Sequence, residues 1–330
     1  MIKRKQKMPG HIKQKVIYEV IDESSDGQKI DNFLIKFLKN VPKSHIYKIL
    51  RSGEVRVNKK RVKTGFRLSL KDSVRIPPVD FTKKKVVNLN KASTDQVKLI
   101  NDNTLFEDDF LLVLNKPSGL AVHGGSGLSF GVIELIRTSR PEHKFFELVH
   151  RIDKDTSGVL LIAKKRTALV GLHKQIREKK VHKKYQVVVN GVWKEKQKIV
   201  DLDLLKTNSD NGQKKVRVVE SFSNNPLVKA SRSVFFLKKV FGSYSLLDVK
   251  IITGRTHQIR TQLSHLGFPI LGDDKYGDFP LNKSLRKIGL KRMLLHALEL
   301  GFVHPITLEK LLIKAPLPTN ISEFIAKNES

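Results

Sequence analysis

A charged turn that runs directly into an apolar strand constrains this chain more than any other feature. Residues 150–155 (HRIDKD) are followed by a Thr-Ser-Gly turn at 156–158 and by the apolar run 159–163 (VLLIA). A short apolar run bounded by a turn predicts a strand buried in a sheet. Folding alone does not require charged groups at the start of such a strand. The charges therefore indicate either a functional site or a solvated loop, and composition alone leaves both readings open.

The first third of the chain has the pattern of a small folded unit, which we place at residues 29–79. Apolar residues from Ile30 onward recur at i, i+3, i+4, i+7 and i+8, which is one face of an amphipathic helix, and Pro42 would end it. Ser44 is expected to cap a second helix and Gly53 to terminate it. Two short strands of alternating apolar residues are expected to complete the unit.

The rest of the chain is expected to form a separate domain, because 330 residues exceed the length of one typical domain. Residues 1–28 are assigned to a basic extension and a lead-in strand, 80–104 to a polar linker, and 105–330 to the larger domain. Runs of strands with few helices between them predict an α+β fold on a mixed, largely antiparallel sheet. The expected strands lie at 109–115, 184–189, 293–303 and 309–315, with several more between 216 and 252, and the expected helices lie near 131–138 and 166–179.

Positive charge dominates the sequence, because 63 lysines and arginines against 32 acids give a formal net charge of +31. Residues 1–100 hold 25 basic and 9 acidic residues, an excess of 16. An excess of this size favours a polyanionic partner such as an RNA backbone. Between residues 32 and 71 only Glu54 is acidic, which disfavours an ordinary solvated basic helix. The residues expected to bind phosphates here are Lys43, Lys48, Arg51, Arg56, Lys59, Lys60 and Arg61.

Several classes of protein are excluded by what the sequence lacks. Without cysteine it forms no disulfide, thiolate nucleophile or cysteine-ligated metal site. It shows no signal peptide, membrane-spanning run or basic amphipathic helix with a large apolar face, so we expect a cytoplasmic protein without membrane contact. No phosphate-binding glycine motif or metal-binding histidine motif occurs, so no cofactor and no metal is expected. His296 and His304 are expected to be partly buried, hydrogen-bonded residues.

Three long blocks of sequence occur in an order that is typical of one enzyme family. They are residues 112–127 (LVLNKPSGLAVHGGSG), 150–165 (HRIDKDTSGVLLIAKK) and 253–277 (TGRTHQIRTQLSHLGFPILGDDKYG). They resemble the first motif, the His-Arg-Leu-Asp-x-x-Thr-Ser-Gly signature and the third motif of the RluA family of pseudouridine synthases, in particular those that modify large-subunit ribosomal RNA. Ile152 stands in place of the usual leucine. The resemblance extends from about residue 105 to the end of the chain.

This resemblance implies a fold and a function. It implies a pseudouridine synthase catalytic domain whose cleft crosses the middle of the sheet, and residues 30–63 also resemble the S4-like (alpha-L) RNA-binding domain. The implied enzyme isomerises specific uridines of large-subunit ribosomal RNA to pseudouridine without a cofactor. We expect it to act as a monomer with no obligate protein partner.

The family motifs also imply roles for individual residues. Asp153 is the expected catalytic carboxylate, and Arg260 is expected to pair with it and to hold it bidentately. Arg151 is expected to displace the target base from its stack. Tyr185 is expected to stack on the extruded uracil, with a hydroxyl that can handle a proton near C5. Arg255 is expected to contact phosphate at the mouth of the site.

Several alternatives remain open at this stage. Asp155 is the rival carboxylate, and the residues do not distinguish attack of the acid on ribose C1′ from a route through a glycal. A non-catalytic RNA-binding or ribosome-assembly protein on the same scaffold is a second reading, which the complete set of Asp153, Tyr185 and Arg260 disfavours. A glycosidase-like hydrolase is a third reading. It would need a second carboxylate, and we identify none in the third motif.

Overall fold

The computed structural model describes residues 15–38, 41–79, 93–124, 131–208, 214–219 and 225–328. The chain divides into two compact units, Met1–Asn90 and Lys91–Ser330, and each is considered by itself. The first half of the expected basic extension, the first half of the expected linker and the end of the first motif lie outside the described residues. No described helix is long and apolar enough to cross a membrane.

The smaller unit is a four-stranded antiparallel sheet packed against two helices. Leu34 and Ile46, one from each helix, are completely buried among the apolar side chains of the strands. The strand order is β1-β4-β2-β3. The elements are β1 (Ile17–Val20), α1 (Ile30–Phe37), α2 (Lys43–Arg51), β2 (Arg56–Val57), β3 (Lys60–Arg61) and β4 (Ser73–Ile76).

The start of α2 differs from the expected one. The helix begins at Lys43, and Pro42 rather than Ser44 occupies the N-cap position. Pro42 has the extended backbone that precedes a helix, and its carbonyl accepts backbone amides from the first turn. No side-chain cap forms, because the proline ring has no hydrogen-bond acceptor. Gly53 follows α2 with a φ of +74°, the left-handed conformation that a terminating glycine supplies.

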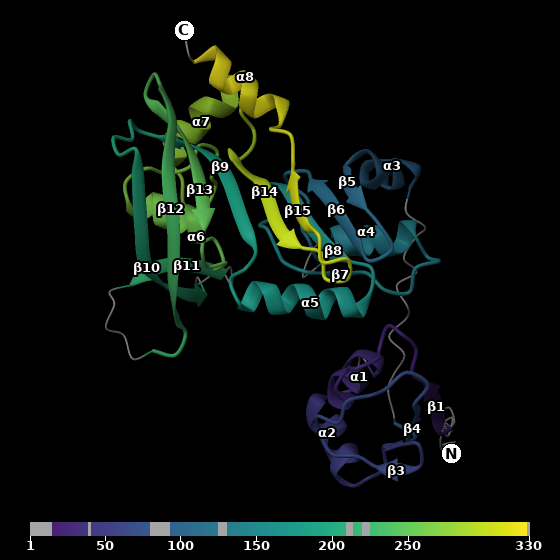
Figure 1. Ribbon diagram of the computed structural model, residues 1–330. Helices are drawn as coiled ribbons and strands as arrows, with labels where there is room; N and C mark the ends of the chain where they lie inside the picture. Colours follow the sequence, from purple (N-terminus) through teal and green to yellow (C-terminus); the bar gives the residue numbers. More distant parts are fainter. Residues whose placement is uncertain are drawn as a thin grey trace, which may run out of the picture. The chain divides into compact units, whose positions relative to one another are not determined.

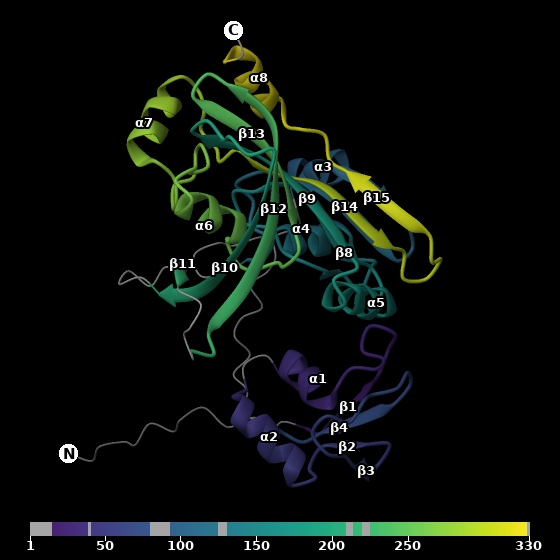
Figure 2. The same ribbon diagram turned by 60° about the vertical axis from the view of Figure 1, so that its left-hand side comes forward.

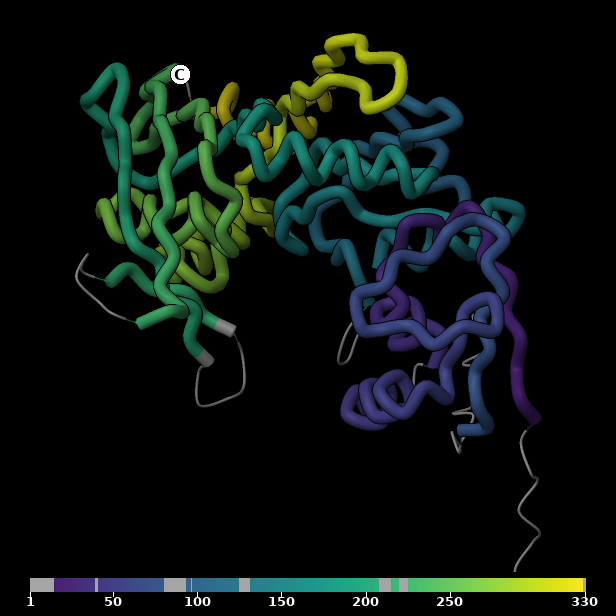
Figure 3. The backbone as a smooth tube through the Cα atoms, turned by 60° about the horizontal axis from the view of Figure 1, so that its bottom comes forward, coloured from purple at the N-terminus to yellow at the C-terminus, as the bar shows by residue number. Residues whose placement is uncertain are grey.

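The larger unit is built on one long mixed sheet (Figure 1), with strand order β11-β10-β12-β13-β9-β14-β8-β6-β5; β15 pairs with β14 and β7 with β8. Figure 3 shows β10, β12 and β13 in green as long strands that run side by side. The strands are β5 (Thr104–Glu107), β6 (Leu111–Lys116), β7 (Glu147–Leu148), β8 (Ser157–Ala163), β9 (His182–Asn190), β10 (Gln197–Asn208), β11 (Lys214–Val219), β12 (Val228–Phe241), β13 (Tyr244–Ile251), β14 (Leu295–Val303) and β15 (Lys310–Lys314). The helices are α3 (Thr94–Asp102), α4 (Val132–Ser139), α5 (Arg166–Arg177), α6 (Gln258–His265), α7 (Phe279–Lys287) and α8 (Thr319–Lys327).

Helices cover both faces of this sheet, and alternate residues of a strand belong to different apolar clusters. Leu160 and Ile162 of β8 pack with α4 and α6, whereas Leu161 packs on the opposite face with α5. Helices α7 and α8 cover a further cluster that includes Val188 of β9. Figure 2 shows α6 beside β10 and β11. Because both of its faces are covered, β8 is buried at every position, as its apolar run predicts.

The expected α+β fold on a largely antiparallel sheet is confirmed, since among the described strand pairs only β8 with β14 is parallel. Helix α3 lies inside the segment that was expected to be a linker. Among the residues of this helix whose burial is described, only Ile100 is well buried, so its apolar period is too weak to reveal it. Helix α6 was not predicted for the opposite reason. Its residues 258–263 are all buried, polar ones included, so it has no amphipathic pattern.

The Thr-Ser-Gly turn is explained by the parallel pairing of β8 with β14. Ser157 Oγ lies 2.8 Å from His296 Nδ1 where the two strands meet. Gly158 has a φ of +109°, and a Cβ added there would lie 2.2 Å from the carbonyl oxygen of Ala297 on β14. Only glycine therefore allows the two backbones to approach this closely.

Gly158→Ala should destabilise the larger unit by more than about 2 kcal/mol, because the new methyl group must displace the backbone of β14. Gly267→Ala is the matched control. Gly267 has a φ of +81°, but nothing lies within 4 Å of its added Cβ, so only the backbone penalty of about 1–2 kcal/mol applies. Calorimetric unfolding measures both. Equal losses of unfolding free energy in the two variants would show that the close approach of β8 and β14 does not determine the cost of the substitution.

Candidate active site

A cavity of about 540 Å³ lies in the larger unit. Its wall is formed mainly by the loop before β8, by the end of α5 with the segment that leads into β9, by β9 itself, and by the loop before α6 together with the start of that helix. Asp153, Tyr185 and Arg260 all line it, and so do Arg151 and Arg255. Residues from the signature motif, from the third motif and from the segment around Tyr185 thus meet around one cavity.

Only one of the two rival carboxylates faces this cavity. Asp153 is the single acid among the described residues that line it, and its side chain is 24% exposed. Asp155 is exposed and is absent from the lining; its backbone carbonyl accepts a hydrogen bond from the hydroxyl of Ser118 at 2.7 Å. A ligand in the cavity would therefore meet Asp153 and not Asp155.

The turn that follows Asp153 is held in place by the first motif. Lys116, at the end of β6, is completely buried, and its ammonium group donates to the backbone carbonyls of Pro117, Leu120 and Lys154 at 2.8, 2.8 and 2.9 Å. Burial lowers the pKa of Lys116 to about 7. The three carbonyls match the three protons of the charged form, so the site still suits an ammonium group.

Arg260 forms hydrogen bonds with two carboxylates instead of binding one of them bidentately. Its Nη1 donates to Asp153 Oδ2 at 3.1 Å, while Nε and Nη2 donate to the two oxygens of Asp273 at 2.8 Å each. The expected contact of Arg260 with Asp153 is present, but the expectation that it is bidentate is wrong. Asp273 is completely buried and needs both hydrogen bonds, whereas Asp153 remains open to the cavity.

The charges of this pair stabilise each other. Burial alone would raise the pKa of Asp273, but the hydrogen bonds and charge of Arg260 outweigh it and hold that pKa below its usual range. Burial would likewise lower the pKa of Arg260, and Asp273 and Asp153 together raise it instead. Both groups are therefore charged at neutral pH. Asp273 lies within the third motif, and its place in that block was the signal from which it could have been recognised.

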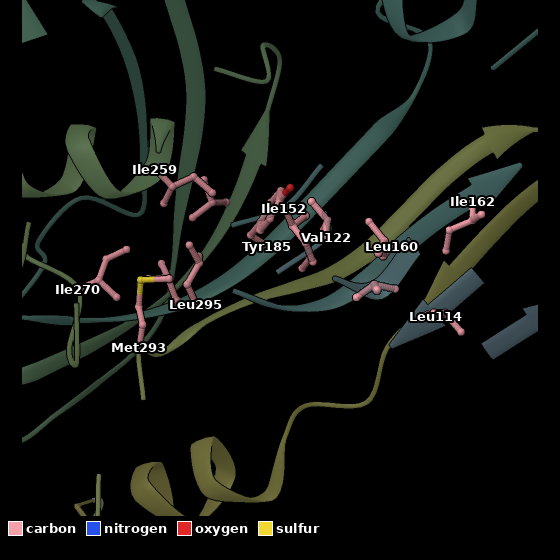
Figure 4. Close-up of a cluster of buried hydrophobic side chains, with 14 of the residues drawn as sticks. Leu114, Val122, Ile152, Leu160, Ile162, Tyr185, Ile259, Ile270, Met293 and Leu295 are labelled. Atoms are coloured by element: carbon pink, nitrogen blue, oxygen red, sulfur yellow. The ribbon is translucent and has the colours of Figure 1, made fainter. Parts of the chain in front are cut away.

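Tyr185 forms the apolar side of the cavity. It lies on β9 within the buried cluster that contains Ile152 and Val122, as Figure 4 shows. Burial and then the negative charge of Asp153 raise the pKa of the Tyr185 phenol. The side chain is therefore a neutral aromatic ring at neutral pH. It can stack on a base and donate a hydrogen bond, but it holds no free phenolate.

His257 was not singled out from the sequence, although the third motif contains it. It precedes α6 with a φ of +52°, a conformation that is uncommon for a residue with a side chain. Its Nδ1 lies 2.7 Å from the hydroxyl of Tyr276, and its Nε2 lies 3.9 Å from Asp153 Oδ1. Burial lowers the pKa of His257 although Asp153 opposes this, so a neutral imidazole faces the acid.

The expected RNA-binding residues all lie at the surface. Arg151 and Arg255 are exposed at the rim of the cavity, and Arg255 Nε donates to the carbonyl of Ala230 at 3.0 Å. In the smaller unit the expected phosphate ligands are exposed on α2 and on the hairpin of β2 and β3, and none of them pairs with a described carboxylate. They are Lys43, Lys48, Arg51, Arg56, Lys59, Lys60 and Arg61.

The two histidines near the end of the chain are structural, but they are more deeply buried than expected. His296 and His304 are 0% and 1% exposed. Nε2 of His296 lies 3.4 Å from the carbonyl of Ala315, and Nδ1 of His304 accepts the backbone amide of Thr307 at 2.9 Å. Within the described ranges, no group of three or more His, Asp or Glu side chains is arranged to hold a metal ion.

Two family models match the chain. The model for RNA pseudouridylate synthase matches residues 110–265, and the model for the S4 domain matches residues 28–74. The first range includes Asp153, Tyr185 and Arg260, and the second includes all of the basic residues on α2 and the β2–β3 hairpin.

Known proteins match over nearly the whole chain. It is 48% identical over 314 residues to the ribosomal large subunit pseudouridine synthase C of Pasteurella multocida, covering 95% of this chain and 94% of that protein. It is 49% identical over 307 residues to the protein of the same name from Yersinia pestis, covering 92% and 94%. Among solved structures, human RNA pseudouridylate synthase domain containing 4 matches with a TM-score of 0.57 and 26% identity, covering 70% of this chain and 94% of that one.

Asp273→Asn should destabilise the larger unit by about 3–5 kcal/mol, because it removes half of a buried ion pair. Asp274→Asn is the matched control. Asp274 pairs with Arg286 at the surface, where a pair contributes about 0–1 kcal/mol. Urea denaturation at several pH values measures both variants.

The pH dependence follows from the lowered pKa of Asp273. Its stabilisation is complete above the pKa of an unfolded aspartate, roughly 3.9, and is lost as the pH falls through the lower folded value. The difference between wild type and Asp273→Asn should therefore shrink only in strong acid. If the difference in the free energy of unfolding stayed constant down to the lowest pH, Asp273 would not be stabilised by the ion pair.

Proposed function

This chain belongs to the RNA pseudouridylate synthase family, and from that membership we propose that it isomerises specific uridines of large-subunit ribosomal RNA to pseudouridine, with Asp153 as the catalytic carboxylate. Two of its relatives are named ribosomal large subunit pseudouridine synthase C, and this name supports the proposed substrate. The observation that carries the assignment is that Asp153 is the one acid, among the described residues, in the wall of the cavity.

The reaction is an isomerisation that needs one carboxylate near the sugar. The bond from ribose C1′ to uracil N1 breaks, and its electron pair stays with the base. The base turns, C5 donates an electron pair to C1′, C5 loses a proton and N1 gains one. Nothing is oxidised or reduced. Asp153 either attacks C1′ or takes a proton from C2′, and either route returns it to its starting state.

The target uridine must leave its stack before it can reach Asp153. We assign the displacement of the base to Arg151, which is exposed at the rim, and stacking on the uracil to Tyr185, whose ring lines the cavity. Arg260 orients the acid through a hydrogen bond of 3.1 Å, and Arg255 binds phosphate at the mouth.

A hydrolase with two carboxylates is disfavoured. The third motif does contain a second acid close to Asp153, contrary to the sequence reading, namely Asp273. Its side chain is completely buried against Arg260 and does not line the cavity, so it cannot activate a water molecule there.

The two parts of the chain divide the work. In this proposal, residues 29–79 form the S4-like domain that binds RNA through its exposed basic side chains, the linker occupies residues 80–104, and residues 105–330 form the catalytic domain. Phosphate contacts position the enzyme on the RNA, while the cavity selects the uridine. The enzyme works in the cytoplasm as a monomer, without a cofactor or a metal ion.

Asp153→Asn should lower pseudouridine formation to background, because an amide neither attacks C1′ nor accepts a proton. The fold and the affinity for RNA should be retained. Asp155→Asn is the matched control and should stay close to wild type, since this side chain lies outside the cavity lining. Chemical mapping of pseudouridine in transcribed large-subunit RNA measures both. Equal loss in the control would assign the chemistry to the other acid.

Replacing Lys59, Lys60 and Arg61 together by glutamine should weaken RNA binding and flatten its dependence on salt. Each lost phosphate contact reduces the slope of log K against log salt by about 0.7–0.9. The control removes the same charge from Lys283, Lys310 and Lys327, which are exposed in the larger unit. Filter binding over a range of salt concentrations compares the two. Identical slopes would show that the β2–β3 hairpin does not contact RNA.

A further inference from the structure

Lys183 lies in the wall of the cavity, and no described carboxylate pairs with its charge. It precedes Tyr185 by two residues on β9, and because alternate residues of a strand share a face, both side chains line the cavity. Its Nζ lies next to the loop before α6, since a Cβ added to Gly254 would be 3.9 Å from it. With the described residues, the side chain of Lys183 forms no hydrogen bond and no ion pair.

The other basic residues around the cavity differ from Lys183 in exposure or in pairing. Four of them are exposed at the rim of the cavity, where water solvates their charges. The fifth, Arg260, is buried and is neutralised by two carboxylates. Lys183 is only partly exposed, and burial lowers its pKa. An unpaired cation in such a place costs stability in the free protein and is typical of a functional site. The exposed residues are Arg151, Arg177, Lys179 and Arg255, and the buried one is Arg260.

We propose that Lys183 is a further catalytic residue, whose ammonium group contacts a carbonyl oxygen of the target uracil and stabilises the negative charge that the base carries when its bond to C1′ breaks. This inference rests on the proposed function and adds a residue to it. It requires no additional reactant, because the ammonium group keeps its protons throughout.

The chemistry of the detached base fits a cation at this position. When the bond from N1 to C1′ breaks, the electron pair on N1 is delocalised onto the carbonyl oxygens O2 and O4. A fixed cation beside one of these oxygens interacts more strongly with the anion than with the neutral base, so it lowers the barrier rather than merely tightening binding. Charge is lost again when C5 bonds to C1′.

Lys183 and Asp153 occupy different parts of the cavity wall, because the charge of Asp153 contributes to the raised pKa of Tyr185, whereas burial is the cause of the lowered pKa of Lys183. The charge of Lys183 acts instead on His150, three positions before the acid. If C1′ lies at Asp153 and the uracil lies over Tyr185, the far edge of the base is directed toward Lys183.

A phosphate group of the RNA is the alternative ligand for the ammonium group of Lys183. The low exposure of Lys183 argues against this alternative. Phosphates of an RNA chain stay at the surface, and the exposed arginines at the rim are the groups that suit them. The flipped base enters the cavity further than its backbone does. The partly buried Lys183 is therefore matched to the base.

The first test compares Lys183→Met, Lys183→Arg and the control Lys184→Met, in the full-length protein. Lys184 is the next residue on the same strand, but it points to the other face and pairs with Asp248 at 2.9 Å. Lys183→Met should lower the single-turnover rate by about 10²–10³-fold, the loss typical of one charge-stabilising donor. RNA affinity should not change and thermal stability should stay the same or rise, because the unpaired cation is removed. Lys183→Arg should recover part of the rate, and Lys184→Met should react like wild type.

The second test identifies the atom that Lys183 contacts. The target uridine is replaced by 2-thiouridine or 4-thiouridine in an RNA fragment, since sulfur accepts hydrogen bonds more weakly than oxygen does. One of the two should slow wild type but should not slow Lys183→Met any further, a coupling that a purely structural lysine would not show. Coupling only to a phosphorothioate beside the target would assign Lys183 to the backbone and overturn the inference, as would an unchanged rate in Lys183→Met. If wild type itself forms no pseudouridine in unmodified RNA, the proposed function fails instead.

Discussion

The double ion pair of Arg260 is the interaction on which the cavity depends. It joins three segments, namely the loop before β8 through Asp153, helix α6, and the turn that carries Asp273. A buried guanidinium must be neutralised within its own surroundings. Asp273 satisfies two of its nitrogens, and the ring of Tyr276 lies 5.1 Å from its centre. The arginine is therefore fixed before it meets Asp153, and the acid that faces the ligand is oriented by a group that is already rigid.

The first motif has a different task from the other two. None of its described residues, 112–124, contributes a side chain to the wall of the cavity. Instead Lys116 binds the carbonyl of Lys154, one position after Asp153, and the amide of Gly119 donates to the same carbonyl. A buried lysine surrounded by backbone carbonyls explains why a charged residue ends the apolar strand β6. The orientation of the Asp153 side chain thus depends on two interactions. One is the ion pair with Arg260, and the other is the set of hydrogen bonds that hold the backbone carbonyl of Lys154.

Much of this arrangement could be predicted from the sequence, because periodicity and motif order carry the information. The amphipathic helix from Ile30 and the buried strand of residues 159–163 follow directly from their apolar patterns. The division of Arg260 between two acids could not be predicted, since no pattern in one dimension tells which of several carboxylates is buried. Lys183 escaped notice for a similar reason. In a sequence with 63 basic residues, one lysine beside another reveals nothing until the strand separates their faces.

The parallel pairing of β8 with β14 affects the order in which the parts of the chain fold. It joins Ser157 to His296 across 139 positions, and Asp153 meets Arg260 across 107. Contacts of such separation form late, while a compact amino-terminal unit can fold as soon as it leaves the ribosome. The nascent chain is therefore expected to complete its basic unit well before its cavity. Under the proposed function, an unfinished copy would bind RNA before it could modify a uridine.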